Sequence, residues 1–386
     1  MPPNAYLGLR VGMTISASIP AAVIAMGITR IIFKKNSILE SNMVQTIGSA
    51  GESVAAGAIF TMPALFLWAK EDLINQPSLL SISLITLCGA ILGVLFMIPL
   101  RNSIIVQEHG ILPYPEAQAC AEVLLAGEKK GSDAKAVFSG MAIATLLIST
   151  ILLKVSGDTG AHGMVSAITI GSIICVIAAI AGDTSQDLKT GYILGATPKK
   201  QQIGELVGAI ISALTIGGVL ILLDSAWGFG SKELAAPQAT LMKLVTEGVM
   251  NGNLPWSYVF IGAACTVLFE LLGLPSLAVA IGIYLPIELT APIMLGGVLR
   301  RLMDKKNKTQ SSESSKGVLF CSGLIAGEGL MGVLLAILTV AGVADKIGLG
   351  ANIPAGVRLA GSVILLVVLV TLIVCHNCSA KNEKAE

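Results

Sequence analysis

The stretch MVSAITIGSIICVIAAIA, residues 164–181, contains no charged side chain, and the polar run GDTSQDLKTG follows it directly at residues 182–191. A helix needs about 20 mostly apolar residues to cross a bilayer. Comparable apolar runs lie at residues 11–33, 50–69, 79–100, 136–153, 203–223, 258–272, 277–299, 317–343 and 357–375. Together they predict an all-α, polytopic membrane protein of about 10–12 transmembrane or re-entrant helices.

The composition of the whole chain supports this assignment. Of its 386 residues, 54% are hydrophobic and 13% are charged, and the mean hydropathy is +0.82. Soluble domains carry about 25% charged residues, so this chain lacks the charge needed to cover a water-exposed surface. Lipid is therefore the expected solvent. The net charge of +1 says nothing about nucleic-acid or acidic partners. No stretch combines aromatic residues with a basic groove, so the sequence does not indicate a nucleic-acid partner.

No motif of a known enzyme class is present in the sequence. The chain has no phosphate-binding loop, no HExxH and no nucleophile elbow, and its three histidines (His109, His162 and His376) are scattered. Cys375 and Cys378 have metal-ligand spacing, but they end an apolar run and have no second pair. We therefore expect no enzymatic activity, no metal site and no bound cofactor. Residues 1–10 lack the pattern of a cleavable signal peptide.

The basic residues indicate how the chain crosses the membrane. They cluster at residues 30–35, 129–135, 189–200 and 300–316, and short basic loops stay in the cytoplasm. A first span that runs inward places the first three clusters inside. Placing the fourth cluster inside requires residues 237–248 to cross the membrane, or a neighbouring segment to turn back. Residues 305–316, rich in Lys, Ser, Asn and Gln, are expected to form a flexible cytoplasmic linker.

Two shorter stretches, residues 115–127 and 237–248, open with proline and close with glycine, which is typical of broken or re-entrant helices. The sequence YPEAQA at residues 114–119 also resembles APQAT at residues 236–240, which suggests an internal repeat. Interrupted segments at matching places often mark a substrate path. The candidates for that path are Tyr114, Glu116, Gln118, Glu122, Pro237 and Gln238. A helix-start carboxylate is the alternative interpretation of Glu116.

Carboxylates inside apolar runs are the next candidates. Ala-Gly-Glu occurs at residues 50–52, 126–128 and 326–328, and Ala-Gly-Asp occurs at residues 181–183. Glu52 and Glu328 have apolar or small neighbours on both sides, and burial favours the neutral form of a carboxyl group. They are therefore candidates for proton coupling. The alternative is a structural role, in which each glutamate is hydrogen-bonded to a facing helix.

The polar run at residues 183–192 allows two interpretations. It is either an ordinary surface loop between two spans, or a cytoplasmic gate or ion-pair network suited to a zwitterionic ligand. The candidates for the second role are Asp183, Gln186, Asp187 and Lys189.

Several longer motifs resemble signatures of the oligopeptide transporter family, most closely of its prokaryotic members. They are NMVQTIGSAGES (residues 42–53), MIPLR (97–101), LPYPEAQACAEVL (112–124), AGDTSQDLKTG (181–191), GIYLP (282–286) and IAGEGLMG (325–332). The resemblance implies an α-helical transporter of small peptides, or of metal chelates as in its yellow-stripe branch, driven by the proton gradient. It also implies a multi-pass protein of the bacterial inner membrane, adds Tyr284 to the substrate path, and leaves open a homo-oligomer.

The sequence departs from the family pattern in three places. Members usually have a further helix before the motif YLGLR, which lies here at residues 6–10. The run SGMAIATLL at residues 139–147 resembles a late motif, yet it follows the early segment directly, so a central block of helices is expected to be missing near residues 135–140. Ala117 stands where the family has glycine.

The sequence therefore divides into parts at residues 1–138 (early motifs), 139–304 (late motifs), 305–316 (linker), 317–376 (C-terminal helices) and 377–386 (polar tail). The predicted function is proton-coupled symport of small oligopeptides or peptide-like solutes. The alternatives are metal-chelate transport and a truncated membrane protein that does not transport.

Overall fold

The protein was analysed as a computed structural model, which describes residues 2–11, 21, 37–108, 112, 114, 117, 120–121, 148–157, 160–284, 287–307, 316–343 and 355–379. The elements are α1 (Pro2–Val11), α3 (Ile38–Ile59), α4 (Pro63–Lys70), α5 (Leu79–Arg101), the π-helix η1 (Asn102–Gln107), α8 (Ala161–Leu194), α9 (Pro198–Trp227), α10 (Pro237–Asn251), α11 (Trp256–Leu271), α12 (Ser276–Tyr284), α13 (Ile287–Asn307), α14 (Lys316–Val340) and α16 (Ala355–Ser379). The described residues form no β-strand, which confirms the all-α prediction.

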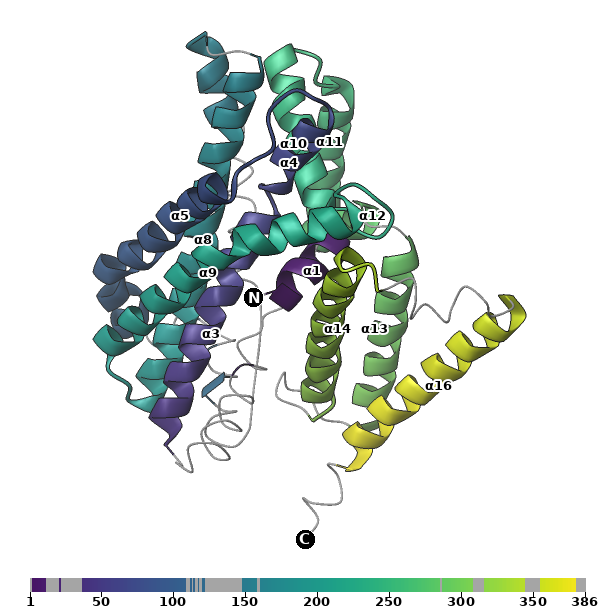
Figure 1. The fold of residues 1–386 in the computed structure, drawn as a ribbon. Coiled ribbons are helices and arrows are strands. Elements are labelled where there is room, and N and C mark those ends of the chain that lie inside the picture. Colours follow the sequence, from purple (N-terminus) through teal and green to yellow (C-terminus); the bar gives the residue numbers. More distant parts are fainter. Residues whose placement is uncertain are drawn as a thin grey trace.

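Within this described part, four helical stretches are long and apolar enough to cross a membrane: Ile38–Lys70, Leu79–Gln107, Ala161–Leu194 and Pro198–Trp227. They form one bundle, in which α3 and α5 lie on opposite sides and each packs against both α8 and α9 (Figure 1). Going round the bundle, the order is therefore α3, α9, α5 and α8.

Glycines let these helices approach closely. A Cβ atom added to Gly57 of α3 would lie 2.6 Å from the Cα of Val176 in α8, and one added to Gly208 of α9 would lie 2.4 Å from the backbone oxygen of Ile47 in α3. Such distances leave no space for a side chain. Small residues play this role in membrane bundles generally, because they bring backbones together where no hydrophobic effect drives association.

The same contacts give the directions of the helices. Gly204 and Gly208 of α9 face Met43 and Ile47 of α3, so these two helices run the same way. In the same manner, the glycines of α5 that face α8 show that α5 and α8 run parallel to each other: Gly89 faces Val176 and Gly93 faces Ile180. One end of the bundle therefore collects the first turns of α3 and α9 and the last turns of α5 and α8. We call it the polar end.

Local sequence explains where these helices begin and end. Ser37 caps α3 by accepting a hydrogen bond from the backbone of Glu40, and Ser78 caps α5 in the same way from Ser81. At the end of α8, Gly195 adopts a left-handed conformation with φ of 77°, which favours glycine. Pro198 then begins α9, because a first-turn proline costs the helix no hydrogen bond.

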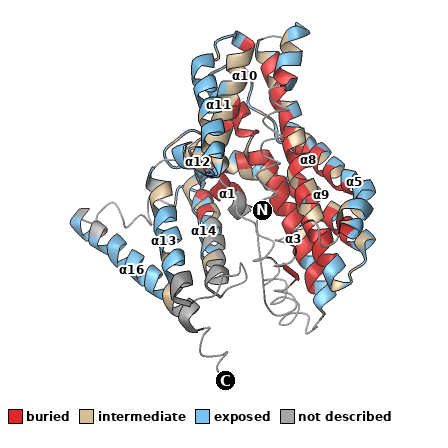
Figure 2. Ribbon diagram, turned by 180° about the vertical axis from the view of Figure 1, so that it is seen from behind, coloured by how far each residue is buried: buried red, intermediate tan, exposed pale blue. Residues whose placement is uncertain are grey.

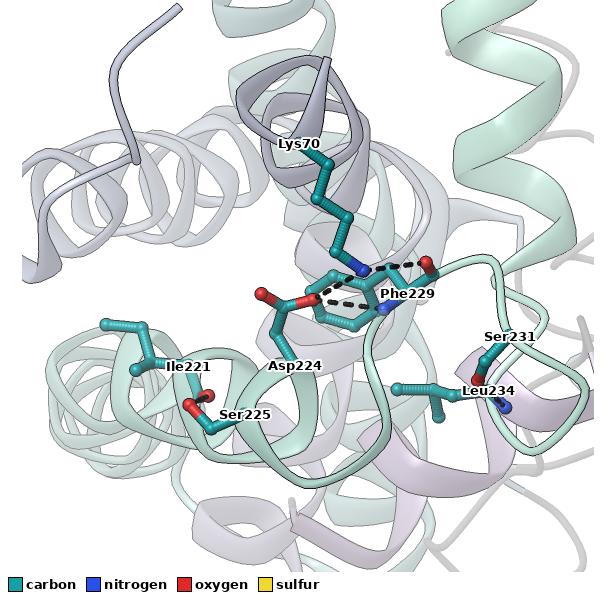
Figure 3. Close-up of polar contacts among 7 residues, drawn as sticks. All are labelled: Lys70, Ile221, Asp224, Ser225, Phe229, Ser231 and Leu234. Carbon is teal, nitrogen blue, oxygen red and sulfur yellow. Dashed lines mark hydrogen bonds and ion pairs between the residues drawn. The ribbon is translucent and has the colours of Figure 1, made fainter. Parts of the chain in front are cut away.

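At the opposite end of the bundle, Lys70 of α4 binds the turn after α9 (Figure 3). We call this end the clasp end. Lys70 donates to the backbone oxygen of Phe229 at 3.0 Å, and its Nζ lies 3.3 Å from Oδ1 of Asp224. The same Oδ1 accepts from the backbone nitrogen of Phe229 at 3.0 Å. One lysine thus ties the end of α4 to the turn that ends α9.

Helix α10 packs beside this end, where Trp68 of α4 donates to Glu247 of α10 at 2.6 Å. With 15 residues, α10 is shorter than the roughly 20 residues that cross a bilayer. Of the two arrangements left open for the fourth basic cluster, its length favours a neighbouring segment that turns back.

The remaining helices are not part of the four-helix bundle, although α1 packs against α3 and shares a hydrophobic core with it. The ring of Tyr6 in α1 packs on Gly332 of α14, which joins two segments far apart in the sequence. The described side chains of α11, α13 and α16 are mostly exposed (Figure 2), and many of them are apolar. Exposed apolar helices are what a multi-pass membrane protein presents to lipid.

Several expected boundaries differ in the structure. The run at 50–69 is two helices, since α3 begins earlier, at Ile38, and a turn at residues 60–62 separates it from α4, whose first residue is Pro63. The run at 277–299 is likewise divided into α12 and α13. Residues 305–307, expected in a flexible linker, continue α13; the rest of that linker up to residue 315 lies outside the described residues.

The largest difference concerns the polar run at residues 183–192. The structure shows no loop there, because α8 continues without a break to Leu194. The surface-loop interpretation is therefore wrong. The run stays helical because other helices supply hydrogen-bond partners to its polar side chains.

Candidate functional site

The centre of the polar end is the carboxylate of Asp187 in α8, which is 1% exposed. Its Oδ1 accepts a hydrogen bond from Nε2 of Gln45 in α3 at 2.6 Å, and its Oδ2 accepts from the hydroxyl of Ser49. Gln45 and Ser49 are four residues apart, so they share one face of α3. A buried charge is tolerable only with such partners, and these two join α3 to α8.

The third helix enters this network through Gln201 of α9. Its Nε2 donates to the backbone oxygen of Asp187 at 2.9 Å and to Oδ1 of Asn42 at 3.2 Å. Asn42 in turn donates to Gln45 at 3.1 Å. All of these side chains are buried, so the first turns of α3 and α9 and the end of α8 form one connected hydrogen-bond network.

The same part of α8 binds Ala117, a residue of the motif YPEAQA. Oε1 of Gln186 accepts from the backbone nitrogen of Ala117 at 3.0 Å, and the hydroxyl of Thr190 donates to the backbone oxygen of Ala117 at 3.1 Å. Gln186 and Thr190 are four residues apart and thus bind both polar groups of one residue. Two motifs far apart in the sequence meet here.

Lys189 occupies the remaining side of this end and is 1% exposed. Its Nζ donates to the backbone oxygen of Ile105 in η1 at 2.9 Å. The same atom lies 5.1 Å from the ring centre of Tyr114 and 5.3 Å from that of Tyr192, within the range of cation–π attraction. Lys189 thereby joins α8 to the π-helix that follows α5.

The π-helix has an identifiable origin in the sequence. Pro99 lies inside α5 and cannot donate a backbone hydrogen bond, which disturbs the helix at this point. The chain then adopts the wider π geometry at residues 102–107, a feature frequent at functional sites. Arg101, at the junction, donates to Gln202 of α9 at 3.0 Å.

One buried acid in this region was not singled out from the sequence. Glu205 of α9 is 1% exposed, and neither of its carboxylate oxygens accepts a hydrogen bond of normal geometry from a described residue. Asp187 and Asp183 of α8 are its charged neighbours, and the hydroxyl of Thr184 faces it. Glu205 lies inside the apolar run at 203–223, so the criterion that selected Glu52 also fits it.

The two candidates for proton coupling lie in different places. Glu52 is buried in the bundle, seven residues after Gln45 and three after Ser49 on the same side of α3. Glu328 of α14 lies outside the bundle, with a side chain 59% exposed, 3.7 Å from the guanidinium of Arg10 in α1. The apolar sequence around Glu328 predicted burial, but the exposed surface of α14 does not provide it.

The candidates for the substrate path are only partly described. Tyr114 is buried against Lys189, whereas Glu116, Gln118 and Glu122 lie outside the described residues, as does the side chain of Tyr284. Pro237 and Gln238 begin α10, which belongs to the clasp end rather than the polar end. These residues therefore do not form one cluster.

The two proline motifs nevertheless share a local backbone feature. The residues before the prolines, Tyr114 and Ala236, both have positive φ, 32° and 44°, which is uncommon for residues other than glycine. Ala117 packs on the last turns of α8, while α10 shares a core with Met164 near the start of α8. The two motifs thus lie towards opposite ends of one long helix. The internal repeat remains a prediction.

The polar end combines features that a membrane protein uses to bind and move polar solutes. Carboxylate, amide and hydroxyl groups from α3, α8 and α9 are buried together at the end of helices that are otherwise apolar. Such groups are costly inside a membrane and usually mark substrate or ion pathways. The described residues contain no group of three or more His, Cys, Asp or Glu side chains placed to hold a metal ion.

Comparison with known proteins gives a consistent picture. A model of the OPT oligopeptide transporter family matches residues 3–138 and 132–339. A Haemophilus influenzae protein named as an oligopeptide transporter is 34% identical over 237 residues, which cover 52% of this chain and 37% of the relative. A yeast protein (Saccharomyces cerevisiae) with the same kind of name is 28% identical over 42% of this chain and 25% of its own length.

An Arabidopsis thaliana protein named as a metal–nicotianamine transporter is 27% identical over 52% of this chain and 30% of the relative. These matches span between a quarter and two fifths of the length of the relatives. No solved structure matches the chain. The two family matches overlap at residues 132–138, next to the position where the sequence predicts a missing block. Together they cover most of the sequence, so the chain belongs to the OPT oligopeptide transporter family.

Proposed function

We propose that the chain is a secondary transporter that moves small oligopeptides or peptide-like solutes together with protons. The observation that carries this proposal is the buried hydrogen-bond network of Asp187, Gln45, Ser49 and Gln201, which joins three membrane-length helices at one end of the bundle. Family membership and the names of the relatives support transport as the activity.

The chemistry of the polar end suits a solute with both charges. Asp187 and Glu205 supply acidic groups and Lys189 supplies a cation, while the amides supply both donors and acceptors. The end groups of a peptide are an ammonium and a carboxylate, which need partners of both kinds. Hydrogen bonds between charged groups and amides would orient such a solute.

Orientation in the membrane follows from charge. The first turn of α9, directly after the short connection from α8, carries Lys199 and Lys200, both exposed, at the polar end. Because short basic loops stay inside, we propose that the polar end faces the cytoplasm of a bacterial inner membrane. In this arrangement the network would act as the inner gate.

The test is uptake by the purified full chain in liposomes. Vesicles with an acidic exterior should accumulate labelled short peptides, and a proton ionophore should abolish the accumulation. Empty vesicles and vesicles without a pH gradient are the controls. Absence of uptake by correctly folded protein, shown by its helical circular dichroism and a single species in detergent, would leave the alternative of a membrane protein that does not transport.

A second candidate substrate is a metal chelate. It is favoured by the relatives named as metal–nicotianamine transporters. The same vesicles, with a radioactive metal in chelated or free form added to the outside, would distinguish peptide transport from metal-chelate transport. Uptake of the chelate without peptide uptake would replace the peptide proposal.

A further inference from the structure

Glu205 is the least compensated polar side chain of the polar end. It lies seven residues after the start of α9, so at 1.5 Å per residue it is about 10 Å inside the helix. Its side chain is 1% exposed, and both of its oxygens lack a hydrogen-bond donor of normal geometry among the described residues. Asp187, by contrast, accepts two hydrogen bonds from α3, one from Gln45 and one from Ser49.

The charged groups around Glu205 make its ionised form costly. Across the interface, α8 presents Asp187 and Asp183 to it. Two cations of the polar end hydrogen-bond to other groups: Lys189 donates to Ile105, and Arg101 of α5 donates to Gln202. From α3, the buried acid is Glu52. The titratable groups that act on Glu205 across the interface are therefore acids of the same sign.

A buried carboxyl group in such surroundings needs a cation of its own. An unpaired ionised group deep in protein loses its hydration without compensation, whereas the neutral acid loses little and can donate its O–H. The hydroxyl of Thr184, which faces Glu205, can accept that hydrogen bond. The described residues offer no metal-ligating group of three acids, histidines or cysteines here, so a proton fits this position better than a metal ion.

We propose that Glu205 is the proton-binding carboxyl group of this transporter, with Thr184 as its hydrogen-bond partner and Asp183 and Asp187 as the charges that respond to its state. This inference rests on the proposed function, for which it names the coupling residue. On binding, a proton from water at the polar end forms an O–H bond on Glu205. On release the same bond breaks and the proton returns to water, and no group is oxidised or reduced.

The position of Glu205 explains how proton binding would move helices. When Glu205 is neutral, α9 can pack closely against α8, and Gln201, one turn earlier, keeps its bond to the backbone of Asp187. When Glu205 is ionised, repulsion from the two aspartates favours separation of α9 from α8. The network that closes the polar end would then open.

The experiment reads the proton directly and does not depend on transport. The full chain is placed in liposomes, and infrared difference spectra are recorded while the pH is stepped from alkaline to neutral, above the range of about pH 4 in which exposed carboxyl groups take up protons. A neutral carboxylic acid absorbs at its own carbonyl-stretch frequency, which ionised carboxylates lack. We expect such a band in the wild type and its loss in the Glu205→Gln variant, which keeps the size and hydrogen-bonding ability of the side chain.

Two control variants keep the result specific. Glu247→Gln changes a partly buried glutamate at the clasp end, which accepts from Trp68, and it should retain the band. Thr184→Val should retain the band at a shifted frequency, because the neutral acid loses its acceptor. If Glu205→Gln does not fold, the carbonyl-stretch frequency of Thr184→Val still tests the proposal. An unchanged frequency in that variant would overturn the assignment of the proton to Glu205.

Other outcomes overturn the proposal as plainly. A band that survives in correctly folded Glu205→Gln places the proton elsewhere. A band that disappears when sodium replaces choline at constant pH shows that a metal cation, rather than a proton, occupies the site. If the wild type transports nothing yet Glu205→Gln loses the band, the proton site stands and only the proposed transport fails.

Discussion

At the scale of single residues, Asp187 is the contact on which the polar end most depends. Its carboxylate accepts hydrogen bonds from Gln45 Nε2 and from the Ser49 hydroxyl, and its backbone oxygen accepts one from Gln201. Leaving a buried donor unsatisfied costs about 1 to 3 kcal/mol. We therefore expect Asp187→Asn to lower the stability of the protein by about that amount.

Thermal unfolding in detergent, followed by circular dichroism, measures this effect. The matched control is Asp72→Asn, because Asp72 is exposed and has φ of 55°, a conformation that asparagine adopts readily. The control should unfold at the wild-type temperature. Equal unfolding temperatures for Asp187→Asn and wild type would show that the network contributes nothing to stability.

The candidate site was foreseen in part. The structure brings Asp183, Gln186, Asp187 and Lys189 to one end of the bundle because all four lie in the last three turns of α8. Their partners could not be read from the sequence, since Gln45 and Gln201 come from other helices and look like ordinary polar residues near helix ends. Glu205 could have been found, because it is an acid within an apolar run.

At the scale of helices, close packing through glycine makes a sharp prediction. Gly208→Ala would place a Cβ atom 2.4 Å from the backbone oxygen of Ile47. Since backbone cannot move aside as a flexible side chain can, α3 and α9 would have to separate, at a cost of about 1 to 3 kcal/mol.

Gly218→Ala provides the control in the same helix, because nothing lies within 4 Å of an added Cβ there. Alanine is the better helix former by about 1 kcal/mol, so this variant should be neutral or more stable than wild type. Unfolding temperatures of the two variants measure the difference. Similar values for both would contradict the close approach of α3 and α9.

The same scale shows which helices the sequence could predict. The run at 79–100 agrees with α5 because its apolar residues and its capping serine are contiguous. The end of α8 and the start of α3 were missed for one reason. Both are polar segments whose side chains hydrogen-bond to each other across the bundle, and a local pattern cannot reveal a partner 138 or 142 residues away.

At the scale of the whole molecule, the bundle has an unusual order. Helices α3 and α5 come from the first segment matched by the family model, and α8 and α9 come from the second. In the order α3, α9, α5, α8, each helix has its main neighbours in the other segment, while α3 and α5 share little contact. Neither segment alone can bury the faces that the bundle buries.

This alternation has a consequence for synthesis and assembly. The two segments need each other's surfaces but not a peptide bond between them, so the chain should tolerate a cut. The chain can be divided at residue 139 and its two segments co-expressed as separate polypeptides. An affinity tag on the first segment should then retrieve the second from detergent extracts. The Gly208→Ala change, which separates α3 from α9, should weaken this recovery, whereas Gly218→Ala should not. Failure of the unmodified halves to copurify would mean that the continuous chain is required, and success would make this protein a natural two-piece complementation system.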